Sequence, residues 1–271
     1  MNTTPWFKKK PFIFSSIAIV LIAIIGTIFY FTTQNKEDQT YDDQFMSSLS
    51  KGLERRWDIT DSTPDDEFGK AEYKKSINAE LDSVEQYQDK KFKDSKLKEQ
   101  AVSYVNVLKD SKSTLDSYGS DSFHDDWEAQ YNKRTGILVK INNIQKIKVS
   151  KKYQDNLDEI LGSGHAANKN DTFKTNLNNI FKSADFQAQP DEDYEEGDYL
   201  DYTATVKNTT GEDIEDFTAD IKLKDESGTV VDTDYIDADS WNKDESVNFE
   251  ISTDKHFSSY EVKITNATIA K

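Results

Sequence analysis

Residues 200–207 read LDYTATVK, an alternation of apolar and polar side chains at every position. Successive side chains of a β-strand point to opposite faces, so this pattern predicts a strand with one buried and one solvated face. Residues 217–223, 247–251 and 260–264 repeat the pattern, with turn-forming sequences between them. Strands of this kind form antiparallel sheets, and we expect an all-β sandwich of about six or seven strands over residues 199–271.

In the part of the chain before these strands, the apolar period is about four residues instead of two. Phe45, Leu49, Leu53 and Trp57 share one side of a helix at this spacing. Similar stripes continue along residues 36–185, with short polar connections between them. Short connections favour antiparallel neighbours, so we expect an α-helical bundle as an extracytoplasmic domain.

Two shorter helices are expected at the end of this helical region. Leu157 and Leu177 stand at the centre of two separate apolar stripes. Residues 162–165 read GSGH between them, and glycine-rich segments of this kind end helices. The sequence therefore predicts a turn at residues 162–165.

An uncharged stretch near the N-terminus predicts a membrane anchor. The residues from Pro11 to Phe31 carry no charge, and a helix of that length spans the roughly 30 Å hydrocarbon core. Lys8–Lys10 precede it, so the positive-inside rule places residues 1–10 in the cytoplasm and the later domains outside the cell. We expect a single-pass transmembrane signal anchor at residues 11–33. A cleaved signal peptide is the alternative, although small residues would then follow the apolar run.

Charge and cysteine content restrict the classes of function. The formal net charge of the chain is −17, and residues 186–271 contain 23 acidic and only 7 basic side chains. Such a surface repels nucleic acid, which we exclude as a partner. The chain has no cysteine, which excludes disulfides and thiol chemistry and favours a bacterial exported protein. Residues 186–198, which are rich in acid, are predicted to be a linker.

The C-terminal third resembles a known type of domain. The residues that carry the resemblance are Tyr202–Asn208, Leu223–Gly228, Val230–Val231, Lys243–Ser246 and Phe249. They are similar to the FxLYD-type domain, a small immunoglobulin-like module on surface proteins of Gram-positive bacteria, although Lys224 stands where that family has a tyrosine. The resemblance implies a protein of the Bacillota cell envelope, and it implies no catalytic residues.

No pattern of residues predicts a catalytic site. The chain has three histidines: His124, His165 and His256. None of them is spaced from another histidine or from a carboxylate as metal ligands are, so we expect them at the surface or at helix ends. Ser163 lies in Gly-Ser-Gly, but a nucleophile elbow needs Gly-x-Ser-x-Gly between a strand and a helix. The sequence therefore predicts a protein that is not an enzyme and needs no cofactor.

An acidic run before the strands is the candidate for a calcium site. Asp191, Asp193, Glu195 and Asp198 place carboxylates close together, and Ca²⁺ binds through oxygen ligands. An EF-hand loop that began at Asp191 would need glycine at its sixth position, whereas the glycine here is the seventh residue. An irregular calcium site remains an alternative to a solvated linker.

These observations predict a membrane-tethered binding module that contacts an envelope protein or a cell-wall component. Trp57, Trp127 and Tyr131 in the helical region are expected to be core residues by default. They are the candidate interaction residues if they form an exposed patch, because exposed aromatic patches mark contact sites. One alternative is an extracytoplasmic hydrolase acting on glycan or peptide. Another is an acidic structural spacer in the cell wall.

Overall fold

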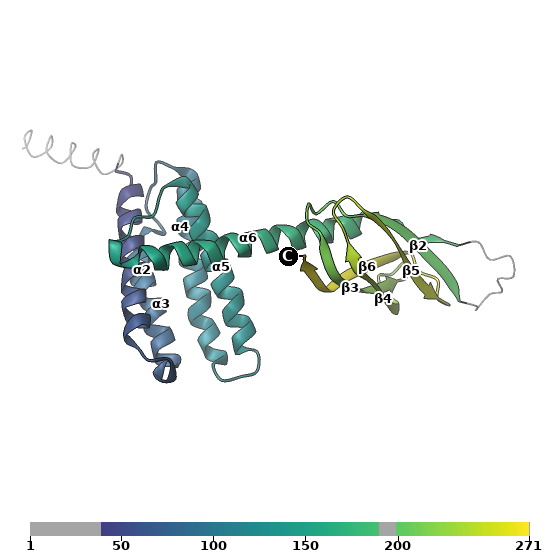
Figure 1. Cartoon of the computed structure of the whole chain (residues 1–271), viewed down its shortest axis with the longest axis horizontal. Helices are drawn as coiled ribbons and strands as arrows, with labels where there is room; N and C mark the ends of the chain where they lie inside the picture. Colours follow the sequence, from purple (N-terminus) through teal and green to yellow (C-terminus); the bar gives the residue numbers. More distant parts are fainter. Residues whose placement is uncertain (1–38, 190–198, 271) are drawn as a thin grey trace, which may run out of the picture. The chain divides into compact units, whose positions relative to one another are not determined.

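The computed structural model describes residues 39–189 and 199–270, which form two compact units that divide between Gly164 and His165. The predicted anchor at residues 11–33 and the predicted calcium ligands at residues 191–198 lie outside the described residues. Among the described helices, none has the length and apolar character needed to cross a membrane. Helices form the first part of the chain and antiparallel strands the last part, as the sequence predicted (Figure 1).

Among residues 39–164 of the first unit, four antiparallel helices with short connections form a bundle (Figure 1). Consecutive helices are neighbours: α2 packs against α3, α3 against α4, and α4 against α5. The bounds of the helices are α2 Asp42–Ser62, α3 Lys70–Val84, α4 Ser95–Thr114, α5 Phe123–Ile144 and α6 Gln154–Lys182. Single 3₁₀ turns in the connections span Asp65–Glu67, Glu85–Tyr87, Leu115–Ser117 and Lys151–Tyr153.

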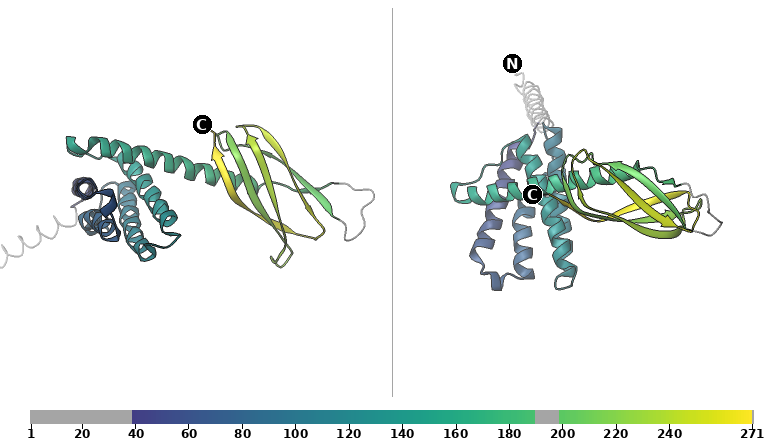
Figure 2. Two further views of the ribbon diagram at one scale, coloured as in Figure 1. Left: turned by 60° about the horizontal axis from the view of Figure 1, so that its bottom comes forward. Right: turned by 45° about the vertical axis from the view of Figure 1, so that its right-hand side comes forward.

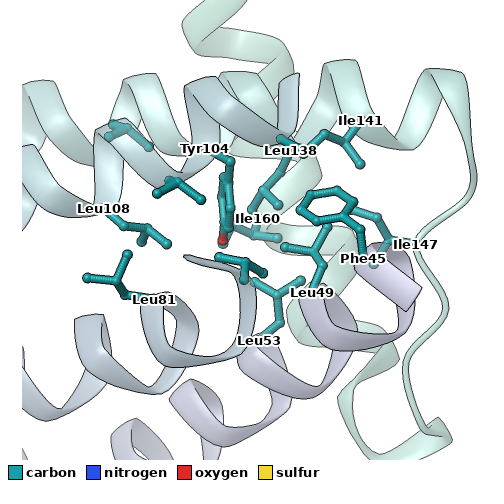
Figure 3. Packing of buried hydrophobic residues seen from close by; sticks show 14 of the residues in the cluster. Phe45, Leu49, Leu53, Leu81, Tyr104, Leu108, Leu138, Ile141, Ile147 and Ile160 are labelled. Carbon is teal, nitrogen blue, oxygen red and sulfur yellow. The ribbon is translucent and has the colours of Figure 1, made fainter. Parts of the chain in front are cut away.

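The apolar stripes of α2 to α5 and of the first part of α6 meet in one core. Figure 3 shows Phe45, Leu49 and Leu53 of α2 in the same cluster as Leu138 and Ile141 of α5, and all five are fully buried. Side chains fix the helix ends as well: the Asp94 carboxylate accepts hydrogen bonds from the backbone N–H groups of the first turn of α4, at 2.8 and 3.0 Å. The first part of α6 lies across this bundle (Figures 1 and 2).

The predicted turn at residues 162–165 is wrong, because α6 runs through it as one helix of 29 residues. Gly164 is buried, and a Cβ atom added there would lie 2.3 Å from the backbone oxygen of Thr135 in α5. Glycine therefore lets two helix backbones approach each other here, and it does not end the helix. A Cβ atom at Gly162 would meet no atom within 4 Å.

Within the described part of the second unit, the strands form two antiparallel sheets of three strands each (Figure 1). One sheet has the order β1-β2-β5 and the other β4-β3-β6, and side chains from both sheets share one core. The strand bounds are β1 Gln187–Ala188, β2 Leu200–Lys207, β3 Ile214–Lys224, β4 Val230–Trp241, β5 Ser246–Thr253 and β6 Ser259–Ile269. The four alternating segments of the sequence all lie in strands, and their alternation matches the buried and exposed positions of β2, β3 and β5.

Aromatic rings fill the core between the sheets. Phe217, Trp241 and Phe249 contact one another at centroid distances of 5.3 to 5.6 Å. Phe181 from the end of α6 stacks on Phe217 at 5.2 Å, with the two rings nearly parallel. The sequence placed this helical segment with the bundle, whereas its buried side chains pack with the strands. The Tyr260 hydroxyl donates a 2.9 Å hydrogen bond to the backbone oxygen of Phe181 and further ties the helix to β6.

Strand β4 lies at the edge of its sheet and carries a row of acidic side chains. Two of these carboxylates accept hydrogen bonds from β5 of the other sheet. Asp232 accepts one from the Thr253 hydroxyl at 2.6 Å, and Asp234 accepts one from the Ser252 backbone N–H at 3.0 Å. The acidic row therefore links the two sheets at one edge.

Candidate functional site

A buried cluster of four polar side chains lies inside the helical bundle, and each of its helices contributes one member. Glu80 of α3 is fully buried at the centre. Its Oε1 accepts hydrogen bonds from Arg56 Nη1 of α2 at 3.0 Å and from Arg134 Nη2 of α5 at 2.6 Å. Its Oε2 accepts one from Arg134 Nε at 2.9 Å and another from the Tyr104 hydroxyl of α4. The carboxylate is thus held by all three neighbouring helices.

The charges in this cluster do not cancel. Burial alone would raise the pKa of Glu80, but the charges of Arg134 and Arg56, with the hydrogen bonds to the carboxylate, hold that pKa below its ordinary value. Burial lowers the pKa of Arg56, and the charge of Arg134 lowers it further. Burial raises the pKa of Tyr104 and keeps its hydroxyl neutral. Two guanidinium groups therefore surround one carboxylate, and the cluster has one positive charge in excess.

Two charged residues of this cluster occupy positions on the apolar faces of their helices, and this is visible in the sequence. Glu80 lies three residues after Ile77 and four before Val84, so it falls on the buried face of α3. Arg134 likewise lies four residues before Leu138 on the buried face of α5. A charged residue at a stripe position indicates a buried ion pair, because lone charges are rarely buried. The partner on another helix is not visible in the sequence.

A pocket of about 290 Å³ opens beside this cluster, within the helical unit. Both arginines of the cluster line it, and their side chains are only 13% (Arg56) and 3% (Arg134) exposed. The remaining lining residues are mainly aromatic and come from α2, α5, α6 and the segment at the start of α3: Trp57, Thr60, Phe68, Tyr73, Trp127, Tyr131, Asn156, Glu159 and Ile160. The pocket thus combines aromatic walls with a positively charged group.

The three interaction residues predicted from the sequence meet in this pocket. Trp57 is buried in the core, while Trp127 and Tyr131 are half-buried and line the pocket from α5. Tyr73 packs its ring against Trp127 at 4.5 Å in an edge-to-face arrangement, which fixes that indole. The Trp57 ring is 5.6 Å from the ring of Tyr153. Trp127 and Tyr131 are therefore the two predicted residues that are open to a ligand.

The other residues considered in the sequence remain separate. His124, His165 and His256 are all exposed, and Ser163 lies in the middle of α6 rather than between a strand and a helix. Within residues 39–189 and 199–270, no group of three or more His, Asp or Glu side chains is placed to hold a metal ion. Among the residues selected from the sequence, Trp57, Trp127 and Tyr131 are therefore the ones that come together in one site.

Comparison of this chain with family models, curated proteins and solved structures gives no match. The aromatic pocket and the charged cluster beside it therefore carry the functional argument.

Proposed function

We propose that this chain is a membrane-tethered, non-enzymatic binding protein of the cell envelope. In this proposal the uncharged segment from Pro11 to Phe31 anchors it, and the later residues lie outside the cell. The ligand, which belongs to another envelope component, occupies the pocket of the helical unit. One observation carries the proposal: Trp57, Trp127 and Tyr131, chosen from the sequence as interaction residues, line the same pocket.

The chemistry of the pocket supports binding. Ligand pockets commonly have apolar and aromatic walls with a few polar groups that orient the ligand. Here the aromatic side chains supply apolar area, and Arg56 and Arg134 supply fixed donors because Glu80 holds them in place. A hydrolase of glycans would need a second carboxylate facing the first, and Glu159 is the one carboxylate among the pocket's lining residues.

We also propose that the C-terminal strands are an immunoglobulin-like module of the FxLYD type from a Gram-positive envelope protein. Two three-stranded antiparallel sheets around one aromatic core support this assignment. In this proposal the acidic sandwich serves as a spacer, or as a second contact surface in addition to the pocket.

The test is capture of envelope components by the full-length chain in mild detergent, from membrane-protein and cell-wall fractions, with and without calcium. Trp127→Ala and Tyr131→Ala remove pocket walls that are half-buried. Tyr235→Ala is the matched control, since Tyr235 is 63% exposed on β4 and lies outside the pocket. We expect both pocket variants to lose at least tenfold in captured component, and the control to retain it.

Equal capture by the wild type and by both pocket variants would show that the ligand binds elsewhere, and it would overturn the assignment of the pocket. Release of cleaved glycan or peptide from the fractions would contradict the non-enzymatic part of the proposal. Thermal unfolding of each variant, followed by circular dichroism, separates loss of binding from loss of fold.

A further inference from the structure

The pocket carries charges of opposite sign on different helices. Arg56 and Arg134, from α2 and α5, line it while nearly buried, and Glu159 lines it from α6 as an exposed residue. Glu80 accepts one hydrogen bond from Arg56 and two from Arg134, fewer than the five N–H donors that each guanidinium carries. A ligand with both an anionic and a hydrogen-bond-donating end would match this arrangement.

A carboxylate is the anion that suits the cluster. Guanidinium groups bind carboxylates through paired N–H donors, and Arg134 already holds Glu80 in this way. The cluster retains one positive charge in excess of Glu80, and in a nearly buried place that charge is poorly screened by water. A second carboxylate would neutralise it.

The size and walls of the pocket limit the rest of the ligand. A volume of about 290 Å³ is at the small end of the roughly 300–1,000 Å³ of ligand pockets, which suits a group about the size of one amino-acid residue. Trp127, Tyr131 and Phe68 offer apolar surface for a side chain. Asn156 and Glu159 on α6 can accept a hydrogen bond from an N–H group.

We propose that this pocket binds an α-carboxylate whose carbon bears an apolar side chain, in a free amino acid or at the C-terminus of a peptide. The inference rests on the proposed function, because it names the ligand class of the same pocket. The arginines take the carboxylate, the aromatic rings take the side chain, and Glu159 takes the amino group or the peptide N–H.

The test uses the full-length chain in detergent and three small probes: L-phenylalanine, N-acetyl-L-phenylalanine and N-acetyl-L-phenylalanine amide. Tryptophan fluorescence reports binding, because Trp57 and Trp127 line the pocket and phenylalanine does not absorb at the excitation wavelength. We expect saturable changes with the N-acetylated acid and at least tenfold weaker binding of the amide, which lacks the carboxylate. If the free amino acid binds more tightly than the acetylated one, the ligand is a free amino acid. If the acetylated one binds more tightly, the ligand is the C-terminus of a peptide.

Glu159→Gln tests the assignment of the amino group and does not endanger the fold, because Glu159 is exposed. This variant should weaken the binding of L-phenylalanine at least fivefold more than the binding of the N-acetylated acid. Glu128→Gln, an exposed change on α5 outside the pocket, should alter neither.

Several results would overturn the inference. These are equal binding of the acid and the amide, no fluorescence response to any probe, or displacement of the acid by inorganic phosphate at the same concentration. If these results occurred while capture of an envelope component still depended on Trp127 and Tyr131, the ligand class would be wrong and the proposed function would stand.

Discussion

The helical unit and the C-terminal unit fill their interiors in different ways. The interior of the bundle contains Glu80 with two arginines and Tyr104, one residue from each helix. The interior of the strand-containing unit is packed with rings, chiefly Phe181, Phe217, Trp241 and Phe249. Both interiors bury apolar side chains, and the bundle adds directional bonds between charged groups.

The buried charges of the bundle lie next to its aromatic pocket. A buried ion cluster costs desolvation and often contributes little net stability compared with an apolar core of equal volume. Its presence needs another reason, and the pocket supplies one, because Glu80 fixes the two arginines that line it.

The largest effect is expected for Glu80→Gln. The change leaves two buried guanidinium groups without their anion, and breaking a buried ion pair in this way costs about 3–5 kcal/mol of unfolding free energy. Urea unfolding followed by helical circular dichroism would measure it. Glu85→Gln breaks the exposed pair with Lys109 and should cost under ~1 kcal/mol. Similar costs for both variants would remove the distinction between the two cores.

Acid should weaken the bundle through the same carboxylate. The folded-state pKa of Glu80 lies below its ordinary value of 4.5, because the charges of Arg134 and Arg56 outweigh the effect of burial. The stability it contributes is therefore complete above pH 4.5 and is lost as pH falls through the lower folded-state pKa. The difference in unfolding free energy between the wild type and Glu80→Gln should therefore become smaller as the pH falls below 4.5. A constant difference down to pH 2 would contradict the assignment.

A smaller effect is expected where α6 meets α5. Gly164→Ala would place a Cβ atom 2.3 Å from the Thr135 backbone oxygen, and overpacking of this kind costs about 1–3 kcal/mol. Gly162→Ala is the matched control on the same helix, where the added Cβ meets nothing within 4 Å. It should stabilise the protein by about 0.5–1 kcal/mol, because alanine favours the helix. Thermal unfolding of both variants would check this, and equal effects would contradict the close approach.

The smallest effect sharpens the comparison. Ile221→Val in the ring-filled core removes one methylene and should cost about 0.5–1.5 kcal/mol of unfolding free energy. Ile141→Val in the bundle should cost the same, since both side chains are fully buried. Chemical denaturation of the two variants would then show that the cores differ in their charges and not in ordinary packing. A cost several times larger at either site would argue against this.

Much of the architecture was predictable, because the period of apolar residues reports the local backbone. The stripe from Phe45 to Trp57 predicted α2, and the alternation at residues 200–207 predicted β2 with the bounds it has. Strand β4 was harder to predict, because four Asp residues interrupt its apolar pattern. They are tolerated at a sheet edge, where Asp232 and Asp234 find partners on β5.

The prediction of the site was partial for a related reason. Trp57, Trp127 and Tyr131 were selected for their ring chemistry, but nothing in their spacing indicated that they share a pocket with Arg56 and Arg134. The glycines at residues 162–165 were misread, because a glycine that ends a helix and one that admits a neighbouring backbone look the same in a sequence.

The sequence alone determined the kind of each segment: the uncharged stretch from Pro11 to Phe31, the helical stripes, and the alternating strands with their acidic surface. Local periodicity and composition are enough to predict the type of a segment, because they report which of its side chains are buried and which are exposed to water. Only the tertiary structure decided that four helices each give one residue to a buried cluster, that a pocket opens beside it, and that the end of α6 belongs to the strands. Those features depend on contacts between residues far apart in the chain, such as Glu80 and Arg134, and pairings of that kind leave no periodic trace.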